Sequence, residues 1–199
     1  MQDMHLQKIE ELKQLGDYDG ALSLANRLLA QNPRNREVLF QVADLQFRKG
    51  EISKAEKPIN FLLEKELDND AMSYYVKGVL EMEKTNWAEA KDYFRRALHM
   101  LEQDNAEVLR CYGLCEYWSG NREEGILHLK KAYHLNEFDA EIILNLTEVL
   151  ILEKKFLLAS KYIKQYRDQK EKLQFFEREV IYYEEKMRIF EEFIRNHEE

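Results

Sequence analysis

The sequence predicts an all-α protein, an α-solenoid built from stacked antiparallel helix pairs, and three observations support this prediction. First, a small residue recurs at Ala21, Ala55, Ala90, Gly125 and Ala159, at spacings of 34, 35, 35 and 34 residues. A period in this range is typical of stacked helical repeats. Second, the 199 residues include only two prolines and seven glycines. Third, 45% hydrophobic and 34% charged residues suit helices with one buried and one solvated face.

Each repeat is expected to be one helical hairpin, and the recurring small residue lies near the start of its second helix, where two helices must come close together. Hydrophobic periodicity predicts the helices directly. The first helices are expected at about residues 3–15, 36–49, 70–84, 105–119 and 139–153. The second helices are expected at about residues 18–31, 53–67, 87–102, 122–135 and 156–167.

Short turns separate the two helices of a hairpin, and three of these turns contain Gly16, Gly50 and Gly120. Glycine readily takes the left-handed conformation that ends a helix. Asn and Asp side chains lie between hairpins and are expected to cap the helix that follows. Pro58 interrupts the second helix of the second hairpin, where it removes a backbone donor. A kink or a late helix start is therefore expected there.

The hairpins resemble the tetratricopeptide repeat family at specific packing positions. In the third hairpin these positions are Tyr74, Gly78, Trp87, Ala90, Phe94 and Ala97, and in the fourth they are Leu109, Gly113, Gly120, Leu129 and Ala132. The resemblance implies five repeats, at about residues 2–35, 36–70, 71–105, 106–139 and 140–168, which together form one domain over residues 2–168. The chain departs from the family pattern in three ways. Only the first repeat keeps the inter-repeat proline, Pro33. Gly125 replaces an alanine, and Thr147 replaces a glycine or alanine.

The resemblance also implies a right-handed superhelix whose first helices line the concave face. When residues are assigned to that face by their position in the repeat, the face presents apolar and aromatic side chains with a few charges. The expected protein-binding or peptide-binding residues are Phe40, Asp44, Phe47, Met72, Tyr75, Met82, Arg110, Tyr117, Leu144 and Glu148. Aromatic anchors in a groove commonly dominate binding energy, which favours Phe40, Tyr75 and Tyr117. The alternative for each residue is ordinary packing between neighbouring first helices, which is favoured for Val79, Leu114 and Trp118.

Some family members hold the C-terminal carboxylate of a partner through Lys, Asn and Arg side chains on these inner helices. The matching positions here hold Leu6, Glu10, Gln41, Met72 and Val76. This clamp is absent from the sequence. Apolar anchors interspersed with acidic residues suit instead a peptide or amphipathic helix with hydrophobic residues and some Lys or Arg.

Residues 169–199 are expected to form a C-terminal capping or oligomerisation helix, and a single long helix is predicted over residues 170–198 because this segment lacks glycine and proline. Its apolar residues follow heptad spacing. They are Leu173, Phe176, Val180, Tyr183, Met187, Phe190 and Ile194. The residues Phe175, Tyr182, Ile189 and Phe193 widen this stripe beyond what one neighbouring helix covers. The helix is therefore expected to cap the solenoid, to fill its groove, or to form a homodimer through Phe176, Val180, Tyr183, Met187, Phe190 and Ile194.

Charge and composition argue against several classes of function. The formal net charge is −8 and no basic stripe is present, which disfavours nucleic acid as a partner. No stretch approaches the apolar length of a membrane span, and the N-terminus lacks a signal-peptide pattern, so a cytoplasmic protein without membrane insertion is expected. Cys111 and Cys115 are the only cysteines and are expected to pack between helices instead of binding metal. No metal, cofactor or catalytic residue is expected, and the protein is not expected to be an enzyme.

The sequence therefore predicts a non-catalytic protein–protein interaction module, such as an adaptor, scaffold or chaperone, that binds a partner's peptide or helix with apolar anchors in its concave groove. The alternative is a structural assembly protein that self-associates through its C-terminal helix.

Overall fold

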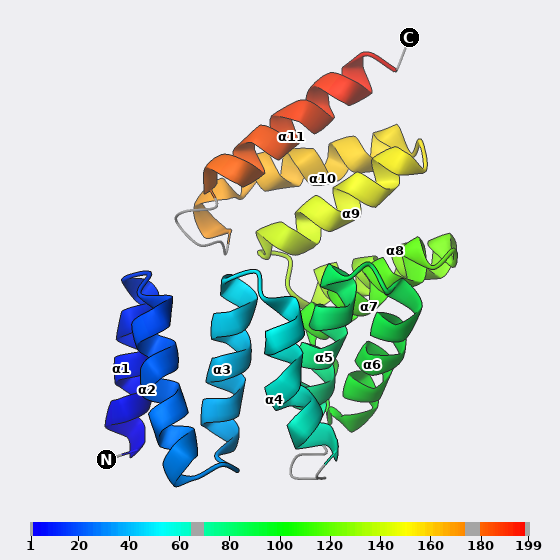
Figure 1. Ribbon diagram of the computed structural model, residues 1–199. Coiled ribbons are helices and arrows are strands. Elements are labelled where there is room, and N and C mark those ends of the chain that lie inside the picture. Colours follow the sequence, from blue (N-terminus) through cyan, green and yellow to red (C-terminus); the bar gives the residue numbers. More distant parts are fainter. Residues whose placement is uncertain (1, 65–69, 174–179, 198–199) are drawn as a thin grey trace. The chain divides into compact units, whose positions relative to one another are not determined.

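The computed structural model describes residues 2–64, 70–173 and 180–197. Over these residues the chain forms eleven α-helices and one short 3-10 helix, with no strand (Figure 1). The prediction of an all-α protein is confirmed. The helices group into two compact units, Met1–Asn86 and Trp87–Glu199, and each unit is described by itself.

The N-terminal unit contains the first five helices. They are α1 (Gln2–Gln14), α2 (Tyr18–Gln31), α3 (Arg36–Arg48), α4 (Ile52–Glu64) and α5 (Ala71–Glu83). Helices α1 to α5 pack in sequence, and α1 also contacts α3. The recurring residues Ala21 and Ala55 are fully buried, because larger side chains there would hold neighbouring helices apart.

Two apolar clusters form the core of this unit. The first lies among α1, α2 and α3 and is made of Ile9, Ala21, Leu22, Ala25, Val38 and Leu45. The second lies among α3, α4 and α5 and is made of Leu39, Ala43, Ala55, Ile59, Leu62 and Leu80. Helix α3 contributes to both clusters, so its remaining free face is the one directed away from α2 and α4.

The C-terminal unit contains the other helices. They are α6 (Trp87–Met100), α7 (Ala106–Trp118), α8 (Arg122–Leu135), α9 (Ala140–Leu152), α10 (Phe156–Asp168) and α11 (Val180–Arg195). Helices α6 to α10 pack in sequence, and α7 also contacts α9. The recurring residues Ala90, Gly125 and Ala159 are buried, as Ala21 and Ala55 are in the N-terminal unit.

Five helices, the first of each predicted hairpin, end in the same left-handed turn. A positive φ occurs at Gly16, Gly50, Thr85, Gly120 and Lys154. At each of these turns the next residue donates its backbone N–H to a carbonyl five residues earlier, as Asp17 does to Leu12 and Lys155 does to Leu150. This pattern is the Schellman motif. The repeat period is therefore visible in backbone geometry even where glycine is missing.

The C-terminal segment differs from the single helix predicted over residues 170–198. Lys170–Lys172 form a 3-10 helix and Leu173 is extended, with φ −66° and ψ 139°, so the helical prediction is wrong there. Residues 174–179, including Phe175 and Phe176, lie outside the described residues. Helix α11 begins at Val180 and packs against α9 and α10. The absence of glycine and proline therefore did not ensure a continuous helix at residues 170–173.

The heptad stripe of α11 accounts for this packing. Tyr183, Met187 and Ile194 are buried, whereas Val180 and Phe190 are half-buried. Tyr182, Ile189 and Phe193 are exposed on a neighbouring face of the helix. The stripe therefore contacts the protein's own repeats.

Pro58 lies inside α4, which begins at Ile52, so the expected alternative of a late helix start is wrong. The ring is buried in the apolar interior. Burial of this apolar ring offsets part of the cost of the missing backbone hydrogen bond.

Candidate interaction surface

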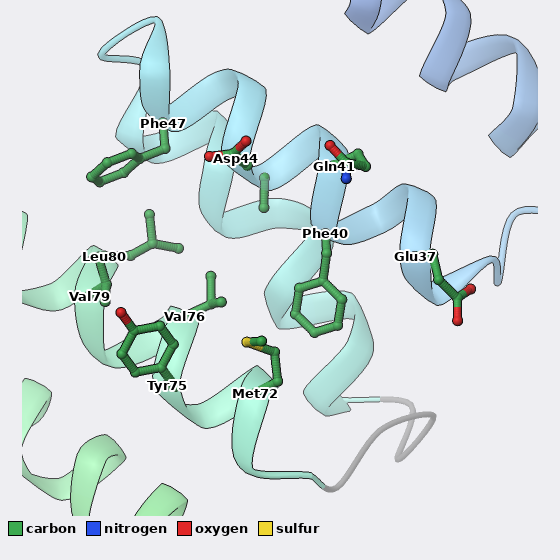
Figure 2. Close-up of a pocket in the computed structure, with 11 residues that line it drawn as sticks. Glu37, Phe40, Gln41, Asp44, Phe47, Met72, Tyr75, Val76, Val79 and Leu80 are labelled. Carbon is green, nitrogen blue, oxygen red and sulfur yellow. The ribbon is translucent and has the colours of Figure 1, made fainter. Parts of the chain in front are cut away.

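A groove runs between α3 and α5 in the N-terminal unit (Figure 2). It encloses a cavity of about 490 Å³. The lining residues are Glu37, Phe40, Gln41, Ala43, Asp44, Phe47, Met72, Tyr75, Val76, Val79 and Leu80. Figure 2 shows Phe40 of α3 directed toward Met72 of α5, with Tyr75 and Val76 on the same side of α5 and Glu37 at the rim.

Helix caps fix the two walls of the groove. The Asn35 side chain caps α3 by accepting a hydrogen bond from the Val38 backbone N–H at 3.2 Å. The Asp70 side chain caps α5 by accepting one from the Ser73 backbone N–H at 2.9 Å. Asp70 also forms an ion pair with Arg36 at the start of α3. The starts of both helices are therefore tied together beside the groove.

Apolar side chains dominate the lining and remain partly accessible. Phe40, Phe47, Tyr75 and Val76 are half-buried, and Met72 is 51% exposed. The Arg36 guanidinium lies 5.2 Å from the centre of the Phe40 ring. Exposed apolar surface that lines a cavity is unfavourable in water, so covering it with another apolar surface would release free energy.

The charged groups of the lining are carboxylates. Asp44 accepts from Arg48 Nε at 3.0 Å and pairs with Lys13 Nζ at 2.6 Å. Lys13 also pairs with Glu10 at 2.9 Å and donates to Gln41 at 3.1 Å. Burial lowers the pKa of Lys13, but its hydrogen bonds to Asp44 and Glu10 outweigh that effect and raise it above the usual value. Lys13 therefore stays charged, and it fixes Asp44 at the edge of the groove.

Five predicted binding residues come together in this groove, namely Phe40, Asp44, Phe47, Met72 and Tyr75. Met82 lies one turn beyond the lining on α5 and is half-buried. The lining also includes Glu37, which the prediction missed. Glu37 lies three residues before Phe40 and seven before Asp44, a spacing that places it on the same helix face.

The other four predicted residues lie in the C-terminal unit, outside the groove. Arg110 donates to Asn145 at 2.8 Å and to Glu107, which ties α7 to α9. Leu144 is buried and Glu148 is half-buried on α9.

Tyr117 was expected to be an accessible contact residue, but it is buried. Only 4% of its surface is exposed, and its hydroxyl donates to Glu153 at 2.9 Å. Burial and this hydrogen bond raise the pKa of Tyr117 to about 12. The ring packs at the ends of α7 and α9, so we do not retain it as a candidate contact.

Comparison with known proteins identifies the repeat. Residues 12–74, which run from the end of α1 to the first turn of α5, match the family model described as "Tetratricopeptide repeat". Residues 12–74 are therefore tetratricopeptide repeat sequence. Tetratricopeptide repeat protein 21B of Xenopus laevis is 24% identical over 139 residues, which cover 69% of this chain and 10% of that protein. The chain thus spans about a tenth of the length of this relative.

Solved structures show the same tetratricopeptide repeat fold. PilW, a widely conserved type IV pilus biogenesis factor, has a TM-score of 0.77 at 20% identity, covering 86% of this chain and 79% of that chain. A thermophilic tetratricopeptide repeat protein of Thermus thermophilus has a TM-score of 0.74 at 22% identity, covering 94% and 99% of the two chains. At these identities the likeness shows the fold, a solenoid of helical hairpins.

The tetratricopeptide repeat is in general a module for protein–protein interaction, and proteins built from it are generally non-catalytic. In this chain the positions that match the carboxylate clamp hold no Lys, Asn or Arg. Three of them line the α3–α5 groove, namely Gln41, Met72 and Val76. The groove therefore offers apolar contact where a clamp would offer charge.

Chemically reactive groups are not gathered at the groove of this repeat protein. Within residues 2–64, 70–173 and 180–197, no three His, Cys, Asp or Glu side chains are placed to hold a metal ion. Cys111 and Cys115 are both buried free thiols, as the packing interpretation predicted. Burial raises the pKa of both thiols, that of Cys115 to about 12, which suppresses their thiolate forms. None of the helices in the described residues has the length and apolarity to cross a membrane.

Proposed function

We propose that this protein is a non-catalytic binding module, of the adaptor, scaffold or chaperone kind, whose α3–α5 groove holds an apolar segment of a partner protein. The observation that carries the proposal is the cavity of about 490 Å³ whose lining is mostly apolar and partly accessible. Its size lies within the range of about 300–1,000 Å³ that is usual for ligand sites. Phe40 and Tyr75, one on each wall, are the proposed anchors.

A binding measurement with two variants tests this proposal. Partners are captured with the wild-type protein, purified and titrated against wild type, Phe40→Ala and Tyr75→Ala. Truncation of an aromatic anchor is expected to weaken binding by about 1–3 kcal/mol, because the lost contact area is central to the groove. Far-UV circular dichroism should remain unchanged, since both rings are only half-buried.

Leu157→Ala is the matched control for these variants. Leu157 is 83% exposed on α10 in the C-terminal unit, so its truncation removes apolar surface without touching the groove. A partner that binds both groove variants as tightly as the wild type would contradict the proposal.

Self-association through α11 is a second candidate function, and it is supported by the exposed residues Tyr182, Ile189 and Phe193. The buried heptad residues Tyr183, Met187 and Ile194 are already covered by the protein's own repeats. A dimer would therefore use the exposed face of α11. Light scattering of wild type and Ile189→Glu tests this candidate, which predicts a concentration-dependent dimer in the wild type alone. A monomeric wild type at high concentration would contradict it.

A further inference from the structure

We infer that the partner segment lies in the α3–α5 groove as an amphipathic helix that places a Lys or Arg beside Glu37. This inference rests on the proposed function, because it names the conformation and chemistry of the segment that the groove would hold. Three properties of the groove support it, namely its supply of hydrogen-bonding groups, its length and its charge.

The groove offers few hydrogen-bonding groups to a partner backbone. Both walls are α-helices, so their own N–H and C=O groups are paired within each helix. Gln41 already accepts from Lys13, and Asp44 already accepts from Arg48. An extended segment would bury its backbone N–H and C=O groups against Phe40, Met72 and Val76 without partners, which is costly. In a helical segment the backbone N–H and C=O groups are already paired with each other.

The spacing of the lining residues also suits a helix. On α3 the lining runs from Glu37 to Phe47 and on α5 from Met72 to Leu80. Ten residues of α-helix rise about 15 Å, so a partner helix of about three turns would span the groove. Such a helix presents apolar side chains at positions i, i+3, i+4 and i+7 along one face. These side chains would enter the cavity beside Phe40 and Tyr75.

The charge of the groove lining indicates which residue type the partner helix would carry. Two carboxylates, Glu37 and Asp44, belong to the lining, and no Lys or Arg does. Asp44 is balanced by Lys13 and Arg48. Among the described residues, no cation lies within ion-pair distance of Glu37, whose side chain is exposed at the rim. A basic residue of the partner would complement this carboxylate.

The position of Glu37 would also determine the direction of the bound helix. Glu37 lies at the N-terminal end of α3, whereas the balanced pair of Asp44 and Arg48 lies two turns further along. An exposed ion pair adds little affinity but distinguishes one orientation or partner from another. The apolar residues of the partner would therefore supply most of the binding, and its basic residue the selectivity.

Selection from two displayed libraries tests this inference without a known partner. One library presents a scaffolded helix randomised on one face, and the other presents linear peptides that contain proline and cannot be helical. Both are selected against the full-length protein, and Phe40→Glu serves as the groove-blocked control. We expect binders that Phe40→Glu abolishes to come from the helical library and to be enriched in Lys or Arg at one end.

A charge reversal then tests the contact with Glu37. Glu37→Lys is expected to weaken the selected helices by about threefold to tenfold, because it replaces an attraction with a repulsion, and a Lys→Glu or Arg→Glu change in the helix should restore binding. Glu64→Lys on α4, an exposed residue outside the lining, is the matched control and should leave affinity unchanged.

The remaining outcomes separate this inference from the proposed function. Groove-dependent binders that come only from the proline-containing library would overturn the helical conformation and leave the groove proposal standing. Helices that ignore Glu37→Lys would overturn the basic contact. Binders from both libraries that tolerate Phe40→Glu would overturn the groove itself.

Discussion

Gly113 of α7 and Gly125 of α8 lie in direct backbone contact. A Cβ atom added at Gly113 would lie 2.9 Å from the Gly125 carbonyl oxygen, and one added at Gly125 would lie 2.6 Å from the Gly113 carbonyl oxygen. Neither distance leaves room for a methyl group. The glycine that departs from the repeat pattern is therefore required by the closest helix approach in its hairpin.

Gly125→Ala is expected to destabilise the protein by about 1–3 kcal/mol, because the added methyl group forces α7 and α8 apart. The higher helix propensity of alanine would offset only part of that loss. Urea unfolding followed by circular dichroism measures the change. Glu124→Ala, at an exposed neighbouring position, controls for propensity and should differ little from the wild type. Equal stabilities of the two variants would contradict the close contact.

Thr85 occupies the left-handed turn position that glycine holds in three of the other hairpins, with φ 60°. A β-branched residue is strained there by about 1–2 kcal/mol, whereas glycine is not. Thr85→Gly is therefore expected to stabilise the protein by about 0.5–1 kcal/mol after its greater unfolded-state entropy is counted. Thr85→Ala keeps the strain and should give no such gain. The midpoint of urea unfolding compares the three proteins, and a lower midpoint for Thr85→Gly would show that the turn is unstrained.

Periodicity predicted most of the fold because one packing rule is repeated along the chain. Ala21, Ala55, Ala90, Gly125 and Ala159 mark where helices approach closely, and all are buried. The break in the helix at residues 170–173 was not predicted, because it depends on how the heptad stripe packs against α9 and α10. The composition of residues 170–173 does not indicate this packing.

The position of a residue within the repeat predicted only part of the candidate site. The α3 and α5 residues of the groove follow from helix spacing, as Phe40, Asp44 and Phe47 illustrate. Tyr117 has the corresponding position in its repeat but is buried. Glu153, at the end of α9, accepts a hydrogen bond from its hydroxyl. Such a pairing depends on contacts 36 residues apart in sequence, and periodicity alone does not distinguish an accessible ring from a packed one.

Glu81 is the centre of a buried charge network that should make stability depend on pH. Lys77 lies 3.0 Å and Lys84 lies 2.8 Å from Glu81 Oε1, and Asn86 donates to Oε2 at 2.9 Å. Burial raises the pKa of Glu81, but these hydrogen bonds outweigh it and lower the pKa from 4.5 to about 2. A lowered folded-state pKa stabilises the protein above pH 4.5, and this stabilisation is lost as the pH falls toward 2.

We expect Glu81→Gln to lower the free energy of unfolding by up to about 3 kcal/mol at pH 7, since Lys77 and Lys84 lose one of the two carboxylates that they share, Glu81, and keep Glu56. The difference from the wild type should shrink as the pH falls from 4.5 toward 2, because the wild-type carboxylate becomes protonated. Urea unfolding across this range measures both proteins, with Glu64→Gln as an exposed control. A difference that stays constant with pH would rule out titration of Glu81 as its cause.

Tyr183 and Tyr182 are adjacent on α11 but face different surroundings, which makes them a matched pair for testing the cap. The Tyr183 hydroxyl donates to Glu141 Oε2 on α9 at 2.6 Å, and the residue is 5% exposed, whereas Tyr182 is 49% exposed. Tyr183→Phe is expected to cost about 1–3 kcal/mol and to increase amide hydrogen exchange in α11, because a buried hydrogen bond to a carboxylate is lost. Tyr182→Phe removes an exposed hydroxyl and should change stability by less than about 0.5 kcal/mol. Similar exchange in both variants would show that α11 is not held on the repeats by this contact.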